Sequence, residues 1–172
     1  MNSIENHNVS LKFEDLVSEY KERLYWHIRR MVISHEDADD VLQNTFIKVF
    51  KNLNNFQGDS QVYTWLYRIA TNECLTFINK RNRTTHLSNE DLQESLVTSL
   101  TSDPYFDGDE AQLKLQQAID TLPTKQKQVF VMKYFDELQY NEISEILGTS
   151  EGALKANYHY AVKKITEYVT DN

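Results

Sequence analysis

Glycine and proline, the residues that interrupt helices most strongly, are scarce in this chain and confined to a few positions. The 172 residues include four glycines and two prolines. Only Gly152 falls inside a segment with an apolar residue at every third or fourth position, and it lies near the start of that segment. Because this spacing places apolar side chains on one face of a helix, the sequence predicts an all-α protein.

Three helices are predicted in the first half, and together they can close a small core. Ser34 is a suitable N-cap for the second helix. A polar loop, Asn54–Gln61, surrounds Gly58 and leads into the third helix, which runs to about Arg83. The second apolar face comprises Ala38, Val41, Leu42, Phe46, Val49, Phe50 and Leu53.

Residues 84–109 interrupt this pattern. They show no sustained apolar periodicity and are rich in Ser, Thr, Asp and Glu. A structureless stretch of this length is unusual inside a compact domain. We therefore expect a flexible acidic linker between two small helical domains, 1–83 and 110–172.

The net charge of −8 is unfavourable for a nucleic-acid binder, but the negative charge is not spread evenly along the chain. Residues 84–112 contain seven acidic residues and no Lys or Arg, whereas residues 1–83 sum to zero and residues 113–172 to −1. The two flanking parts are therefore free to carry local basic faces.

The last third has the layout of a helix-turn-helix. A short helix over Tyr140–Leu147, a turn at 148–150 and a second helix over Glu151–Tyr168 match this motif, whose second helix can enter a DNA major groove. Leu154, Tyr158, Ala161, Ile165 and Val169 form the predicted inner face. A solvated helix surface is the alternative reading of the outer face, whose candidate DNA contacts are Lys155, Asn157, His159, Tyr160, Lys163 and Lys164.

Aromatic and basic residues also alternate along the predicted third helix. Unstacked bases pair with aromatic faces while cations take the phosphates, so this mixture suits single-stranded DNA. The alternative is that Trp65 and the tyrosines simply cover the core. The candidate residues are Phe56, Tyr63, Trp65, Tyr67, Arg68, Asn72, Arg81 and Arg83.

A third surface is predicted on the outer side of the second helix. Asp40, Gln43, Asn44 and Ile47 share this side, and an apolar Ile47 among polar residues indicates a protein contact. The acidic residues near the start of this helix interact favourably with the positive end of the helix dipole. They lack the glycine-containing loop or His/Cys partners of a metal site, so no metal is predicted.

Catalytic motifs are absent from the sequence. It has no Gly-rich phosphate loop, nucleophile elbow or zinc-protease motif, so we expect neither an enzyme nor a cofactor nor a small-molecule substrate. The single cysteine, Cys74, fits a small core residue in a reducing compartment. No signal peptide or membrane span is predicted, and we expect a cytoplasmic protein.

Two segments resemble a known family. The stretch DADDVLQNTFIKVFKNLNNFQGDSQVYTWLYRIATN is similar to region 2 of the extracytoplasmic-function sigma factors, a branch of the sigma-70 family. The stretch AIDTLPTKQKQVFVMKYFDELQYNEISEILGTSEGALKANYHYAVKKI is similar to their region 4. The order of the two segments also fits, and the resemblance runs from about Phe13 to Tyr168.

This resemblance implies partners. It implies an initiation factor that binds core RNA polymerase and promoter DNA, has no active site, is monomeric when free and is inhibited by a membrane-bound anti-sigma factor. Asp40, Gln43 and Asn44 would meet the clamp helices of the polymerase's largest subunit. The loop from Phe56 to Trp65 would capture a flipped base of the minus-ten element, with Asn72 beside it.

Further implied roles concern the second half and the linker. Lys155, Asn157, His159 and Tyr160 would read the minus-thirty-five element, and the acidic linker would pass through the polymerase's RNA exit channel.

The chain departs from the family pattern in two ways. Asn157, Tyr160 and Val162 stand where relatives often carry arginine, which implies fewer phosphate contacts and a shallower salt dependence of DNA binding. Gln139 is a weak cap for the helix that follows it.

Two other functions stay open from the residues alone: a helix-turn-helix regulator that binds DNA without polymerase, and a helical module that binds only protein.

Overall fold

The structure, a computed structural model, describes residues 11–85, 89–102 and 108–171. Those residues form eight α-helices, one short 3₁₀ turn and one π-helical turn, with no strand among them. The elements are α1 (Phe13–Val32), α2 (His35–Asn52), η1 (Leu53–Asn55), α3 (Val62–Thr84), α4 (Asn89–Thr101), α5 (Glu110–Asp120), α6 (Thr124–Phe130), η2 (Val131–Phe135), α7 (Tyr140–Leu147) and α8 (Glu151–Asp171). The predicted all-α class is confirmed.

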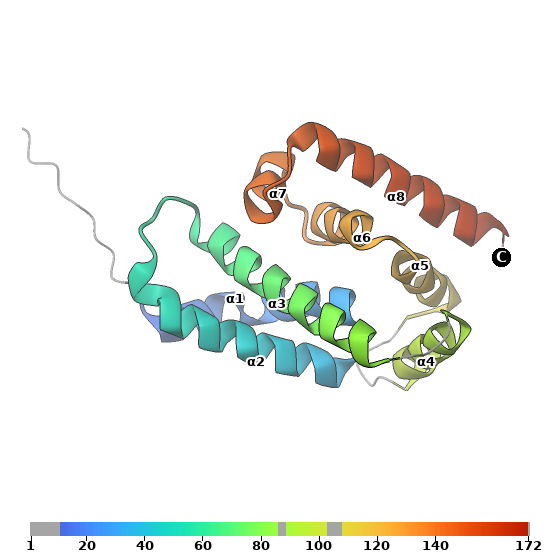
Figure 1. Cartoon of the computed structure of the whole chain (residues 1–172), viewed down its shortest axis with the longest axis horizontal. Coiled ribbons are helices and arrows are strands. Elements are labelled where there is room, and N and C mark those ends of the chain that lie inside the picture. Colours follow the sequence, from blue (N-terminus) through green and yellow to red (C-terminus); the bar gives the residue numbers. More distant parts are fainter. Residues whose placement is uncertain (1–10, 86–88, 103–107, 172) are drawn as a thin grey trace, which may run out of the picture.

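The first three helices pack against one another along their apolar faces (Figure 1). Leu24, Ile28, Leu66 and Ala70 are fully buried between them. The predicted cap of α2 is confirmed, because the Ser34 hydroxyl oxygen accepts a hydrogen bond of 3.0 Å from the Asp37 amide. A two-residue connection therefore folds α2 back along α1.

The second half gathers α5, α6 and α7 on one side of α8. Gly148 ends α7 in the left-handed conformation, with φ of 63°, as a helix C-terminus favours. The weak cap predicted at Gln139 is compensated, because the Glu142 carboxylate accepts a 2.7 Å hydrogen bond from the Gln139 amide. Both ends of α7, the first helix of the helix-turn-helix, are therefore capped.

A π-helical turn, η2, joins α6 to α7, and the sequence did not predict it. The Asp136 amide donates to the Val131 carbonyl at 3.1 Å, five residues back. Glu137 then takes a left-handed conformation, with φ of 55°. This combination ends the helix abruptly and leaves Asp136 buried at the junction with α1.

The prediction of a structureless linker is wrong for residues 89–101, which form α4. Leu100 is buried, and α4 packs against α5. The spacing of Leu92, Leu96, Val97 and Leu100 is helical, but a polar composition concealed it. Two of the linker acids, Asp103 and Asp107, lie outside the described residues.

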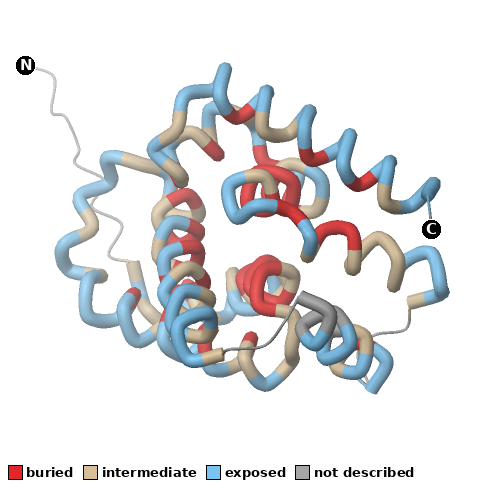
Figure 2. Tube along the Cα trace, turned by 45° about the vertical axis from the view of Figure 1, so that its right-hand side comes forward, coloured by how far each residue is buried: buried red, intermediate tan, exposed pale blue. Residues whose placement is uncertain are grey.

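The two halves of the molecule share one core. Helix α3 contacts α7, and α1 contacts η2. Figure 2 shows buried segments facing one another between the helices of both halves. Buried residues from α1 to α8 form a single continuous cluster.

Two residues of the predicted apolar faces lie outside this core. Phe50 is 65% exposed, and its ring lies at the groove between α1 and α2, beside Phe13. Val169 is 38% exposed because α8 extends past the helices that pack on it. Both were expected to be buried. No helix in the described part of the chain is long and apolar enough to cross a membrane.

Candidate protein and nucleic-acid interfaces

An apolar groove of about 530 Å³ runs between α1 and α2, and we call it the α1–α2 groove. Phe50 and Ile47, the latter 51% exposed, are its most accessible apolar residues. The Phe50 ring packs edge-on against Phe13, with ring centroids 5.2 Å apart. The other lining residues are Val17, Lys21, Leu42, Gln43 and Phe46.

The predicted protein-contact residues lie on or beside this groove. Gln43 and Ile47 line it, while Asp40 and Asn44 are exposed on the same helix. An apolar centre with a polar rim is the usual anatomy of a protein interface. Sequence reasoning missed Phe50 because its periodicity assigned it to the core.

A smaller pocket of about 250 Å³ lies between α2 and α3, and we call it the Trp65 pocket. Trp65 and Asn72 line it as the sequence suggested, and the Phe56 ring lies 4.9 Å from that of Trp65. The ammonium group of Lys48 forms an ion pair with the Glu73 carboxylate. The residues that sequence reasoning missed are Lys48, Asn52, Asn55, Ile69 and Glu73.

The chemistry of the Trp65 pocket suits a nucleobase. Three asparagine amides can both donate and accept hydrogen bonds, and the indole offers an aromatic face. Asn52, Asn55 and Asn72 are exposed, so these amides are accessible. Asparagine is frequent just before the loop, at Asn52, Asn54 and Asn55, and this was the sequence signal for the missed Asn52 and Asn55.

Two other predicted minus-ten residues contact the second half of the protein. The Tyr63 hydroxyl donates to the Glu142 carboxylate, and this hydrogen bond raises the pKa of Tyr63. Arg68 Nη2 donates to the Glu145 carbonyl at 2.9 Å. Helix α7 therefore contacts this face of α3, where Tyr63 is half-buried and Arg68 stays exposed.

The prediction that Tyr67 contacts DNA is wrong for this structure. Its side chain is fully buried, and Arg23 Nε donates to its hydroxyl at 3.1 Å. The His27 ring packs against it at 4.9 Å, and burial raises the pKa of its phenol. Tyr67 is a core residue, as the alternative reading of these aromatics allowed.

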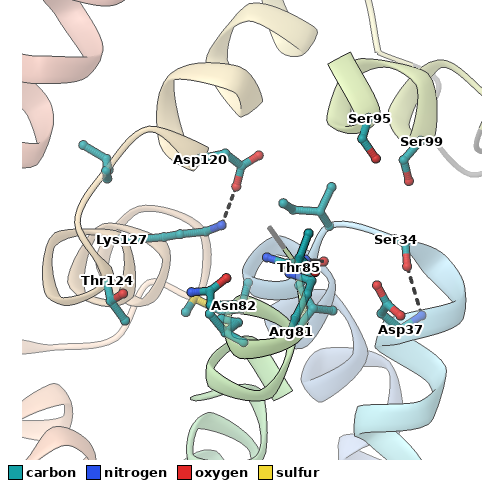
Figure 3. A pocket seen from close by; sticks show the side chains of 15 residues that line it. Ser34, Asp37, Arg81, Asn82, Thr85, Ser95, Ser99, Asp120, Thr124 and Lys127 are labelled. Carbon is teal, nitrogen blue, oxygen red and sulfur yellow. Dashed lines mark hydrogen bonds and ion pairs between the residues drawn. The ribbon is translucent and has the colours of Figure 1, made fainter. Parts of the chain in front are cut away.

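Arg81 and Arg83 lie near the far end of α3. Arg81 is 16 residues beyond Trp65, about 24 Å along a helix, so the two do not share a site. Arg83 is exposed. Arg81 instead lines a separate pocket of about 390 Å³ between α3, α4 and α5 (Figure 3).

Both acidic and basic side chains line this third pocket, and several of them already bond to other parts of the protein. Arg81 Nη1 donates to the Val32 carbonyl at 3.4 Å, while its Nε has no hydrogen-bond partner in the described part of the chain. Lys127 and Asp120 form a buried ion pair at its edge. Ser95 and Ser99 reach toward it from α4, as Figure 3 shows.

The outer face of α8 is open along its length. Leu154, Ala161 and Ile165 are buried against the other helices, which fixes the opposite face outward. The candidate DNA contacts Lys155, His159, Tyr160, Lys163 and Lys164 are exposed, and Asn157 is half-buried. Lys163 lies 3.9 Å from Glu167, so one of these cations has an acidic neighbour.

Gly152, in the first turn of α8, has no packing reason to be glycine. Its backbone is right-handed, and a Cβ added there would meet nothing within 4 Å. Glycine inside a helix costs roughly 0.5–1 kcal/mol relative to alanine. Nothing in the structure of the chain itself explains the glycine at this position.

Asp136 is the buried charged residue that joins the two halves, and sequence reasoning missed it. Its Oδ2 lies 2.7 Å from His27 Nδ1, and its Oδ1 lies 3.8 Å from Arg30 Nη1. A carboxylate can only accept, so His27 donates through Nδ1. Burial lowers the pKa of Arg30. His27 and Asp136 are 109 residues apart in the sequence, so no local sequence pattern could have predicted their contact.

Comparisons with known proteins match two segments of the chain to one family. Residues 16–84 match sigma-70 region 2, and residues 112–165 match sigma-70 region 4. The chain is 32% identical to the ECF RNA polymerase sigma factor SigW of Bacillus subtilis over 92% of this chain and 89% of that protein.

Solved structures show the same fold. The sigma factor RpoE of Bartonella quintana, in complex with the anti-sigma factor NepR, matches with a TM-score of 0.73 and 20% identity, over 92% of this chain and 96% of that one. CnrH, in complex with the cytosolic domain of CnrY, matches with a TM-score of 0.68 and 21% identity, over 93% and 88%.

Region 2 followed by region 4 defines a sigma-70-type transcription initiation factor. The chain belongs to the extracytoplasmic-function branch of RNA polymerase sigma factors. This finding favours the sigma reading over the regulator and the interaction module. Within the described residues, no group of three His, Cys, Asp or Glu side chains is placed to hold a metal ion.

Proposed function

We propose that each of the three accessible surfaces has a separate role in promoter-specific initiation. The α1–α2 groove binds core RNA polymerase, the Trp65 pocket takes a base of the minus-ten element, and the outer face of α8 reads the minus-thirty-five element. Residues 1–83 and 110–172 then act as the two functional domains, with 84–109 as their connection. The protein has no catalytic activity of its own in this scheme.

The observation that carries this proposal is the Trp65 pocket. A regulator that used only its helix-turn-helix would have no role for a base-sized pocket on a different part of the chain. Flipping a base out of the stack costs a few kcal/mol, and stacking on an aromatic face together with amide hydrogen bonds offsets that cost. Trp65, Asn72 and Lys48 supply the aromatic face, an amide and a cation.

The α1–α2 groove supports the polymerase assignment. Exposed apolar patches on a monomer mark interaction sites, and Phe50 and Ile47 give this one an accessible centre. Asp40, Gln43 and Asn44 provide a polar rim that fixes the orientation of the partner. Large apolar residues at the centre of such a patch carry most of the binding free energy.

Simultaneous binding explains how modest individual contacts suffice. Once polymerase and one promoter element are bound, the second element is presented at a high effective concentration. The few cations on α8 are then adequate, because α8 does not have to bind DNA alone.

An anti-sigma factor is the proposed inhibitory partner. One of the similar solved structures is a sigma factor bound to an anti-sigma factor. Core polymerase and chromosomal DNA are both cytoplasmic in bacteria, so we assign the protein's action to the cytoplasm.

Run-off transcription tests the proposed function. The purified protein is added to core RNA polymerase and a DNA fragment carrying the promoter upstream of its own gene, at several salt concentrations. We expect a discrete transcript that requires the protein. Tight operator binding without polymerase, together with no binding to polymerase, would instead support the conventional regulator.

Replacing Phe50 by serine tests the groove. Because this ring is largely exposed, we expect the free energy of unfolding to change by no more than about 0.5 kcal/mol. Loss of a central apolar contact should weaken binding to core polymerase by on the order of tenfold or more. Titration of labelled polymerase measures this change. Tyr134→Ser, which removes an exposed ring from η2, is the matched control, and equal losses in both variants would contradict the assignment.

Asn72→Ala tests the Trp65 pocket. The side chain is exposed, so the fold should be unaffected, while loss of one base contact should lower promoter opening by on the order of tenfold. Run-off yield and permanganate reactivity of unpaired thymines measure opening. Polymerase binding should be unchanged, and Asn79→Ala, two turns further along α3, should behave as wild type. Normal opening by the Asn72 variant would exclude this residue from the base contact.

Gly152→Ala tests whether DNA accounts for the glycine in α8. The free energy of unfolding should rise by up to about 0.5–1 kcal/mol, because alanine favours the helix. Binding to the minus-thirty-five element should fall, since a methyl group would stand between the helix N-terminus and the DNA backbone. Thermal melting and DNA titration measure the two effects. The control Ala153→Gly should melt earlier without losing affinity, and a Gly152 variant that binds as well as wild type would refute a DNA role.

A further inference from the structure

We propose that the pocket lined by Arg81 between α3, α4 and α5, which we call the Arg81 pocket, binds a small zwitterion. Such a ligand carries one carboxylate and one ammonium group, and a free α-amino acid is the simplest kind. The pocket shares no lining residue with the α1–α2 groove or the Trp65 pocket and receives none from α8. The ligand is therefore an effector rather than a substrate, and the inference does not depend on the roles proposed for those three surfaces.

The Arg81 pocket has the size of a small-molecule site. Its volume of about 390 Å³ is enclosed by the α1–α2 corner, the end of α3, helix α4 and the α5–α6 corner (Figure 3). Ligand pockets in proteins measure roughly 300–1,000 Å³ and combine apolar walls with a few polar groups that fix the orientation of the ligand. This pocket lies at the small end of that range, which suits a single small metabolite.

The apolar part of the lining comes from α1, α3 and the α5–α6 connection. Met31, Val32 and Leu122 are buried, whereas Ile33 and Ile78 are half-buried. Apolar side chains of this kind favour contact with the hydrocarbon part of a ligand. An amino acid with an apolar side chain fits this lining better than a fully polar one.

Arg81 brings an unsatisfied hydrogen-bond donor to the pocket. Its Nη1 donates to the Val32 carbonyl at 3.4 Å, whereas its buried Nε forms no hydrogen bond within the described residues. A buried donor without an acceptor is unfavourable. The planar guanidinium matches the geometry of a carboxylate, so a carboxylate in the pocket would supply the acceptor that the chain itself does not.

The other charges of the pocket favour a zwitterion over a simple anion. Asp120 is already satisfied, because Lys127 pairs with one of its oxygens and Gln116 Nε2 donates to the other at 3.1 Å. The Asp37 carboxylate has no hydrogen bond or ion pair in the part of the chain that the structure describes. It would repel an anion and attract an ammonium group. A zwitterion therefore complements both charges without leaving a net charge in the pocket.

Hydroxyl groups complete the polar lining. Ser95 and Ser99 reach toward the pocket from α4, while Thr85 follows α3 and Thr124 begins α6 (Figure 3). A hydroxyl can both donate and accept, so it can serve either end of a zwitterion. Because these elements meet only in the folded chain, a ligand that contacts them would stabilise the protein against unfolding.

Thermal melting of the full-length protein with each standard α-amino acid in turn is the first test. At about ten times its dissociation constant, a ligand of the folded state should raise the melting temperature by roughly 3–6 °C. Calorimetric titration then measures the dissociation constant of the best probe. Melting temperatures that no amino acid changes would overturn the inference.

Derivatives of the best amino acid separate the contributions of its two charges. N-acetylation removes the ammonium charge and amidation removes the carboxylate. Each change should weaken binding by on the order of tenfold or more, because a charge-assisted hydrogen bond is lost. An acetylated or amidated derivative that binds as tightly as the amino acid itself would overturn the zwitterion assignment.

Arg81→Gln and Asp37→Asn test the two charged partners in the full-length chain. Each should weaken binding of the amino acid by on the order of tenfold or more. The residual binding of the acetylated derivative should fall further with Arg81→Gln but not with Asp37→Asn. Arg83→Gln and Glu36→Gln remove exposed charges of the same sign from the same two helices, and these matched controls should bind as wild type.

A purely structural role for Arg81 gives a different result. If this side chain only caps α1 through the Val32 carbonyl, Arg81→Gln would lower the melting temperature without ligand and leave the dissociation constant unchanged. That outcome would overturn the inference. Should Arg81→Gln reduce helix content in circular dichroism, Asp37→Asn at its half-buried position still decides, because unchanged binding by this variant would also contradict the proposal.

Discussion

The buried hydrogen bond between Asp136 and His27 is the polar contact that joins the two halves within their shared core. The carboxylate lies at the end of a π-helical turn, and the imidazole is fully buried in α1, with its second nitrogen 3.2 Å from Thr71 of α3. One hydrogen-bonded chain thus connects η2, α1 and α3. Buried polar groups of this kind tolerate little displacement, because each would otherwise be left without a partner. The angle between the halves follows from satisfying them.

This arrangement divides the functional surfaces into two classes. The α1–α2 groove, the Trp65 pocket and the outer face of α8 point away from the interface and stay accessible. Tyr63 and Arg68 lie at its edge, where both donate hydrogen bonds to α7 and Arg68 stays exposed. A partner that binds the first class meets no obstacle, whereas one that needs the second class must displace α7.

Local sequence patterns predicted the features that depend on neighbouring residues in the chain. Apolar periodicity predicted the helices, the inner face of α8 at Leu154 and Ala161, and hence the outward direction of its basic residues. It failed where tertiary contacts decide. Phe50 has core periodicity but lies in the open α1–α2 groove, and α4 is helical in spite of a polar composition. Tyr67 is surrounded in sequence by residues that suit DNA binding, but its side chain is buried. Asp136 could not be recognised, because its partner is 109 residues distant and a π turn sets its direction.

The interface between the halves combines a continuous apolar cluster with the buried polar contacts of Asp136. If Asp136 and His27 were replaced by apolar residues of similar volume, this arrangement could be as stable or more stable, since no charge would have to be desolvated. Separation of the halves would then expose apolar surface to water at roughly 25 cal/mol per Å², with no hydration gained in return. Buried charges reverse that balance, because separation restores their hydration.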